Sequence, residues 1–212
     1  MVGGNRVTPR LPPPILALSC GQALNLSPTD LVARVEAAVD AGLEGLLLRE
    51  RAWGDALLLE TARILRRVLG TGWLGLSDAP HLIRASGADG VHLSHRALTA
   101  PEVRALVGAD VAIGISDHRS HPRDDGSDAD YCFLSPLHAV RGKEQALGVD
   151  KVIAWAGECA LPAWALGGVG PQDLQALRAG GLAGVACLRG LLAQTSPGEA
   201  LTALRCSWGD DL

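Results

Sequence analysis

The sequence contains few aromatic residues and no excess of positive charge. Phe, Trp and Tyr make up 3% of its 212 residues, and the formal net charge is -4 at pH 7. Single-stranded nucleic acid stacks on aromatic side chains, and basic stripes bind its phosphate backbone. The composition therefore argues against nucleic acid as a partner.

Long apolar runs are also missing. No run approaches the roughly 20 apolar residues that a membrane-spanning helix needs. Residues 1–14, MVGGNRVTPRLPPP, contain no apolar core of the length found in signal peptides. We therefore expect no membrane partner and a cytoplasmic protein.

The cysteines show no pattern of a metal or redox site. There are five, at positions 20, 132, 159, 187 and 206, and none has the close paired spacing of a zinc site or a redox motif. The sequence predicts that most of them are small, buried apolar residues in a reducing compartment.

What the chain does have is a regular alternation of short apolar runs and amphipathic segments. The apolar runs have strand length and continuous hydrophobicity, which is typical of parallel strands covered on both faces. Eight runs are predicted as strands: 15–19, 43–50, 72–78, 90–94, 111–116, 129–135, 162–166 and 183–188.

Helix signals follow most of these strands. Residues 27–42 begin with Ser27 as an N-cap and Pro28 at the first helical position, and they end at Gly42. Further helices are predicted at 54–70, 79–87, 100–108, 149–158, 171–181 and 197–208. The segment after the fifth strand is polar and gives only a weak signal.

Eight strands, each followed by a helix or a stub of one, predict a single (β/α)8 TIM barrel. A doubly wound open sheet is the competing architecture. We expect residues 1–14 to form a flexible amino-terminal arm and residues 15–212 to form the barrel domain.

Paired glycines follow the seventh predicted strand. In barrels of this kind the loops after strands seven and eight often bind phosphate, and glycine lets backbone N–H groups approach an anion closely. Gly167 and Gly168 lie after strand seven, and Arg189 and Gly190 lie after strand eight. We expect a phosphate site there; the alternative is a tight turn beside a solvated arginine.

Five stretches resemble, in order, the successive blocks of one known family, that of thiamine phosphate synthase and TenI (thiazole tautomerase). They are LLLRER at 46–51, SDAPHLIRASGADGVHLSH at 77–95, IGISDH at 113–118, DYCFLSPLHAVRGK at 130–143, and LPAWALGGVGPQDLQALRAGGLAGVACLRGLL at 161–192. The resemblance covers roughly residues 15–205. It implies a (β/α)8 barrel that binds a thiazole phosphate, with the phosphate at the diglycine loop.

This chain departs from the synthase pattern where the family holds a diphosphate. The family has Gln-x-Arg-Glu-Lys after strand two, whereas residues 47–51 read LLRER. The family's Asn-Asp-Arg becomes Ser77-Asp78-Ala79, and residues 94–97, SHRA, lack its second metal-binding aspartate. The resemblance leaves Asp78 as a single magnesium ligand, and one carboxylate is a poor holder of a hard cation.

The loop after strand six departs as well. The family pattern Gly-Pro-x-x-x-Thr-x-Thr-Lys reads SPLHAVRGK at residues 135–143, so both threonines are missing and Lys143 remains. Arg51, Arg96 and Arg141 could supply part of the lost positive charge.

These departures favour the tautomerase branch, which aromatises a dihydrothiazole carboxylate phosphate by moving a proton and needs no metal. His118 matches the family's histidine after strand five, and a histidine suits acid/base catalysis near neutral pH. An ordinary loop histidine is the alternative. Lys143 or Arg49 is expected at the substrate carboxylate. No cofactor is expected; Mg2+ at Asp78 would be needed only by a synthase.

Further residues at strand ends are expected to bind the substrate. They are Arg51, Ser77, His95, Ser116 and His138. His92 lies mid-strand and is expected to be a buried packing residue. Asp78 has a second interpretation, as the N-cap of the next helix.

The leading functional hypothesis is thus a thiazole tautomerase with a small phosphate-bearing ligand as its partner. A thiamine phosphate synthase with a degenerate magnesium site is the first alternative. A non-catalytic binder of thiazole or thiamine phosphate and a different phosphate-handling barrel also remain, because a fold does not fix a function. A homo-oligomer stays open.

Overall fold

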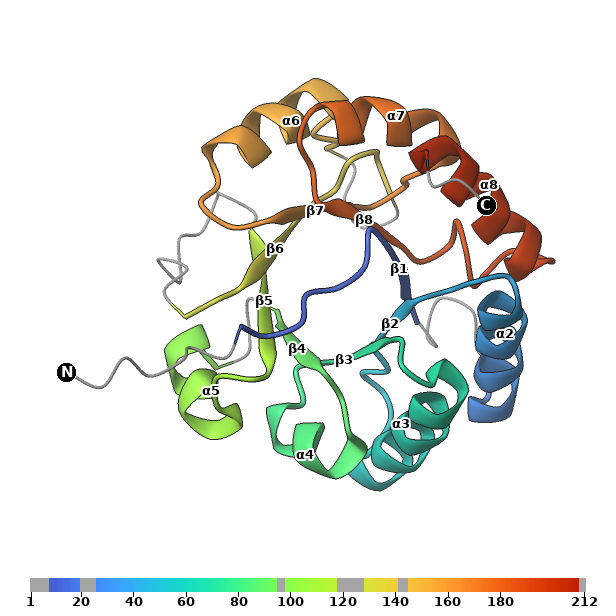
Figure 1. Cartoon of the computed structure of the whole chain (residues 1–212), viewed down its shortest axis with the longest axis vertical. Coiled ribbons are helices and arrows are strands. Elements are labelled where there is room, and N and C mark those ends of the chain that lie inside the picture. Colours follow the sequence, from blue (N-terminus) through green and yellow to red (C-terminus); the bar gives the residue numbers. More distant parts are fainter. Residues whose placement is uncertain (1–7, 20–25, 95–97, 118–127, 141–144, 210–212) are drawn as a thin grey trace.

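The computed structural model is a closed barrel of eight parallel strands with helices around the outside (Figure 1). It describes residues 8–19, 26–94, 98–117, 128–140 and 145–209. The strands pair in sequence order, and β1 also pairs with β8, with Ile15 opposite Val185 and Ala17 opposite Cys187. This closure confirms the predicted (β/α)8 barrel and rules out the open sheet.

All eight predicted strands are present, most of them one or two residues shorter at their ends. They are β1 (Ile15–Leu18), β2 (Gly45–Leu48), β3 (Trp73–Ser77), β4 (Gly90–Leu93), β5 (Ala112–Asp117), β6 (Tyr131–Leu134), β7 (Ala163–Leu166) and β8 (Gly184–Cys187). The helices are α2 (Pro28–Asp40), α3 (Asp55–Leu69), η1 (Pro80–Leu82), α4 (Ile83–Ser86), α5 (Ala100–Val107), α6 (Val149–Glu158), α7 (Pro171–Ala179) and α8 (Pro197–Trp208). Among the described residues, no helix is long and apolar enough to cross a membrane.

The inside of the barrel holds most of the few aromatic side chains. A buried cluster is formed by these rings and three leucines of β1 and β2: Trp73, Tyr131, Phe133, Trp164, Leu16, Leu18 and Leu47. Tyr131 lies edge-on to both tryptophans, with ring centroids 6.2 Å from Trp73 and 5.6 Å from Trp164. A small barrel is filled by side chains rather than open, and here large rings do the filling.

Glycines on the strands make room for these rings. A Cβ at Gly114 or Gly184 would overlap the ring of Tyr131 or Trp164, and one at Gly90 would come within 2.6 Å of a ring carbon of Trp73. Because interiors pack as densely as organic crystals, a methyl group at any of these positions would displace a ring.

The amino-terminal segment closes one end of the barrel. Trp73 Nε1 donates a hydrogen bond to the carbonyl of Arg10, Trp164 Nε1 donates to the carbonyl of Pro13, and Val185 N donates to Pro14, at 2.9, 2.9 and 2.7 Å. Figure 1 shows this blue segment crossing the barrel. The stretch predicted as a flexible arm is therefore anchored from Arg10 to Pro14; residues 1–7 lie outside the described residues.

Arginine–aspartate pairs repeat around the same end of the barrel. In each pair an arginine of one helix reaches the aspartate that precedes the second strand after that helix: Arg66 with Asp89, Arg84 with Asp110, and Arg104 with Asp130, at 2.8, 2.6 and 2.5 Å.

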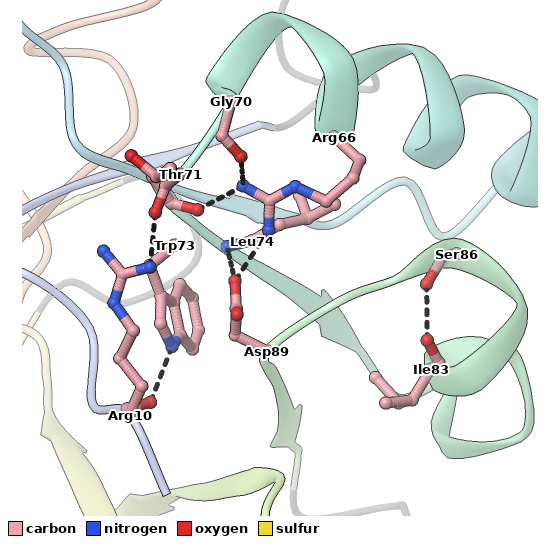
Figure 2. Close-up of polar contacts among 10 residues, drawn as sticks. Arg10, Arg66, Gly70, Thr71, Trp73, Leu74, Ile83, Ser86 and Asp89 are labelled. Atoms are coloured by element: carbon pink, nitrogen blue, oxygen red, sulfur yellow. Dashed lines mark hydrogen bonds and ion pairs between the residues drawn. The ribbon is translucent and has the colours of Figure 1, made fainter.

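Two of these carboxylates also accept a strand N–H. Asp89 accepts from Leu74, as Figure 2 shows, and Asp130 accepts from Ile113, both at 2.8 Å. Both pairs are about three-quarters or more buried, whereas Arg84 and Asp110 are exposed by 61% and 51%. The buried pairs join helix, loop and strand at one point, and the exposed pair does not.

We predict that Asp89→Ala and Asp130→Ala each lower the free energy of unfolding by about 1–3 kcal/mol, because each leaves a buried amide and a guanidinium without their acceptor. Thermal unfolding at pH 7 measures the loss as a decrease of several °C in Tm.

Asp110→Ala is the matched control, since it removes an aspartate from the exposed pair. The hydrogen bond from Arg84 lowers the pKa of Asp110 from 3.8 to about 2, so this pair's contribution is fully present at pH 7 and is lost as the pH falls through about 2. Solvent screening keeps that contribution small. Equal losses in all three variants would contradict the assignment of the buried pairs as the stabilising ones.

Candidate functional site

The loops after β7 and β8 meet at the carboxyl-terminal rim of the barrel. Leu166 and Ala186 are partners in the β7–β8 pairing, so Gly167 and Gly168 leave the sheet beside the start of the loop that carries Arg189 and Gly190. The structure therefore brings together the four residues that the sequence assigned to a phosphate.

Both glycines of this loop are required by the backbone. Gly167 and Gly168 have φ of 99° and 73°, in the region that side chains disfavour. A Cβ at Gly168 would lie 2.9 Å from the Cβ of His138, and one at Gly167 would lie 3.0 Å from Pro136. The two glycines thus make a tight turn against the loop that follows β6.

That turn also presents main-chain donors. In the described part of the chain, the N–H groups of Gly168, Val169 and Gly190 donate to no acceptor. Arg189 is exposed next to them. Backbone N–H groups at a glycine turn, with a nearby guanidinium, form a concave donor set suited to an anion. The tight-turn interpretation and the phosphate interpretation are therefore compatible.

A buried carboxylate ties this turn to the loop after β6. Asp173, in the first turn of α7, is 5% exposed. One of its oxygens lies 2.9 Å from His138 Nε2, and the other accepts the N–H of Gly170 at 2.9 Å. His138, predicted to face the substrate, therefore clamps its loop onto the glycine turn.

Asp173 is the residue that sequence reasoning missed. Its signal was present, because Pro171 stands at the first helical position and an acidic residue two positions later is typical of a capped helix start. Only the fold shows that His138, 35 residues earlier, shares this carboxylate.

A second polar group lies at the ends of β2, β3 and β4. Asp78 Oδ1 accepts the N–H of Ser94 at 2.7 Å, and Asp78 Oδ2 lies 3.8 Å from the guanidinium of Arg51. The N–H of Arg49 donates to Ser19 Oγ at 2.7 Å. Asp78 does not cap the next helix: the N-cap position is Ala79, without a side-chain bond, so that interpretation is wrong.

Beneath the rim, polar side chains continue the inward-facing positions of the strands. Ser77 follows Trp73 at alternate spacing on β3, and Ser116 follows Ala112 on β5. His92 is 4% exposed, lies 3.0 Å from Ser116 Oγ and stacks on Phe133 with centroids 4.0 Å apart. His92 is thus a buried packing residue, as expected, and it orients Ser116.

Three predicted site residues, His95, His118 and Lys143, lie outside the described residues, as do Arg96 and Arg141. The roles assigned to them stay predictions.

The described rim residues do not fit a magnesium ion held by protein carboxylates. No three His, Cys, Asp or Glu side chains of the described ranges are placed to hold a metal ion. The two oxygens of Asp78 already face the Ser94 N–H and the Arg51 guanidinium. Mg2+ takes octahedral oxygen ligands, usually one or two carboxylates with substrate phosphates and waters, and the guanidinium beside Asp78 opposes a cation at this carboxylate.

The fold is a (β/α)8 barrel, and the described rim at the ends of β7 and β8 carries a donor set suited to an anion. The chain belongs to the thiamine monophosphate synthase family, whose profile matches residues 17–191. The resemblance noted from the sequence is therefore confirmed.

Individual relatives agree with this family. A protein of Geobacter sulfurreducens is 32% identical over 182 residues, which is 82% of this chain and 85% of that protein. The thiamine-phosphate synthase of Laribacter hongkongensis is 32% identical over 175 residues, covering 79% of this chain and 83% of its own. The solved thiamine phosphate pyrophosphorylase of Pyrococcus furiosus has a TM-score of 0.78, with 16% identity and 96% of both chains covered, and supports the fold.

We predict that Gly168→Ala weakens the binding of inorganic phosphate by tenfold or more, because a Cβ there meets His138 and the positive φ no longer suits the residue. Phosphorus NMR titration of the purified protein measures the affinity.

Gly181→Ala provides the matched control. Gly181 also has a positive φ, 84°, but a Cβ there would have no atom within 4 Å, and the residue lies between α7 and β8 at the opposite end of the barrel. Its substitution should cost stability and leave phosphate affinity unchanged. A parallel loss of affinity in both variants would show that the diglycine turn is not the site.

Proposed function

We propose that this chain is a transferase of the thiamine-phosphate synthase type, which joins a pyrimidine diphosphate to a thiazole phosphate. The observation that carries the proposal is the 32% identity, over 79% of the chain, to a protein named thiamine-phosphate synthase. The sequence alone favoured the tautomerase. The relatives give the tautomerase hypothesis no support, so the synthase becomes the leading hypothesis and the tautomerase the alternative.

The rim supports a reaction between two anionic substrates. The turn at Gly167 and Gly168, with Arg189, is suited to the monophosphate. Arg51, held near Asp78 at 3.8 Å, and Arg49 are suited to the diphosphate, on the other side of β1. Each substrate then has its own hydrogen-bond donors. The reactive atoms of the two substrates can therefore meet above the aromatic side chains that fill the barrel.

The residues at the ends of β2 and β3 would have to neutralise the negative charge of the leaving diphosphate. When the new bond to the thiazole forms, the diphosphate leaves with the electron pair of the broken C–O bond. A guanidinium already in place stabilises that developing charge without reorganisation. Since the residues at Asp78 do not fit magnesium, the guanidinium of Arg51 performs this task.

A tautomerase is the second candidate, favoured by the single carboxylate at Asp78. A proton transfer needs no diphosphate site, so the lost carboxylates would not matter to it. His118 would then serve as the acid/base, with Lys143 or Arg49 at the substrate carboxylate.

Turnover assays with the two substrate sets separate these functions. We expect release of diphosphate and formation of thiamine phosphate from the pyrimidine diphosphate and the thiazole phosphate. We expect Arg51→Ala to lower kcat/KM by roughly tenfold or more, because one charge-assisted contact to the leaving group is lost. Arg63→Ala is the control: Arg63 is an exposed α3 residue whose guanidinium donates to the carbonyl of Ala85.

Each other outcome points elsewhere. Aromatisation of the dihydrothiazole carboxylate phosphate, without diphosphate release, would establish the tautomerase. Binding of thiazole phosphate with neither turnover, unaffected by His118→Ala, would leave a non-catalytic binder.

A further inference from the structure

Two cysteines that are far apart in the sequence lie in contact in the fold. The Sγ atoms of Cys132 and Cys159 are 3.4 Å apart. Cys132 is on β6, and Cys159 is the C-cap residue of α6. The sequence offered no sign of this pair, because 26 residues separate the two positions and no short cysteine motif is present.

The surroundings of the two sulfurs differ. Cys132 is fully buried between the outer face of the barrel and the helices. Its neighbours on β6, Tyr131 and Phe133, point to the inside of the barrel. Cys159 is only partly buried. Of the two, Cys159 is therefore the one that an oxidant in solution reaches first, and the sulfur of Cys132 lies 3.4 Å from it.

We propose that Cys132 and Cys159 are a redox pair, which a peroxide converts into a disulfide that ties β6 to the end of α6. A disulfide needs an S–S distance of about 2.05 Å, so the sulfurs must approach by only about 1.4 Å. Neither cysteine forms a disulfide in the structure.

The chemistry balances with hydrogen peroxide as the oxidant. The Cys159 thiolate attacks one peroxide oxygen, the O–O bond breaks, and water and a sulfenic acid form. The sulfur of Cys132 then attacks the Cys159 sulfur, the S–O bond breaks, and a second water leaves. Overall the two thiols lose two electrons and two protons, and the peroxide is reduced to two waters.

The cross-link would close a loop that contains part of the candidate site. Residues 133–158 include the loop from β6 to α6, with His138 and Lys143. Since a disulfide restricts the unfolded chain, the oxidised protein should be more stable than the reduced one.

The test uses the full chain in a Cys20→Ser/Cys206→Ser background, which keeps Cys132, Cys159 and Cys187. After a stoichiometric amount of hydrogen peroxide, we expect a mass loss of about 2 Da, disappearance of two of the three thiols in a denatured thiol titration, and a Tm increase of about 5–10 °C. Dithiothreitol should reverse all three. Cys187 should stay reduced, because burial raises the pKa of its thiol to about 12.

Two variants keep the outcome decisive. Cys159→Ser changes a partly exposed residue, so the protein should fold, and it should abolish the mass loss and the Tm increase. Cys187→Ser is the matched control and should leave both unchanged. Retention of all three thiols after peroxide, or a disulfide that persists in Cys159→Ser, would overturn the proposal.

Discussion

The structure depends on one contact above all, the pairing of β1 with β8. Through it, Ile15, Leu16 and Ala17 lie against Val185, Ala186 and Cys187, and the first and last strands of the chain become neighbours. Closure leaves no open sheet edge and places every strand's carboxyl end on one rim. The loops after β2, β3, β7 and β8 lie around one rim only because of this closure.

The two ends of the barrel differ in how their polar groups are satisfied. At one end, Asp89 and Asp130 join helices to strands, and both tryptophans of the interior hydrogen-bond to the amino-terminal segment. At the other end, exposed Arg51 and Arg189 and the amides of Gly168 and Gly190 remain available to a ligand among the described residues. Polar groups satisfied internally stabilise the fold, and those left accessible can bind substrate.

The rim has the diglycine turn at which the resemblance implies a phosphate, but its charged residues depart from the family pattern. Only Asp78 remains of the carboxylates expected to hold magnesium, and it faces Arg51 and the Ser94 N–H instead. Under the proposed function, the guanidinium of Arg51 supplies the positive charge that a metal ion would otherwise bring to the diphosphate. This change, in a chain whose relatives are synthases, makes the handling of the leaving diphosphate the central chemical question about this protein.

The sequence by itself determined the eight strands, their parallel arrangement and the diglycine turn, because strand hydrophobicity, helix caps and glycine are local signals. It misjudged residues 10–14, whose anchoring depends on Trp73 and Trp164 lying beneath them, and it misassigned Asp78 as a possible cap. Only the tertiary structure decided that the carboxylate of Asp173 contacts the imidazole of His138 and that Cys132 contacts Cys159. Such pairs join residues brought together by barrel closure and helix packing, and no pattern within either segment encodes the distance between them.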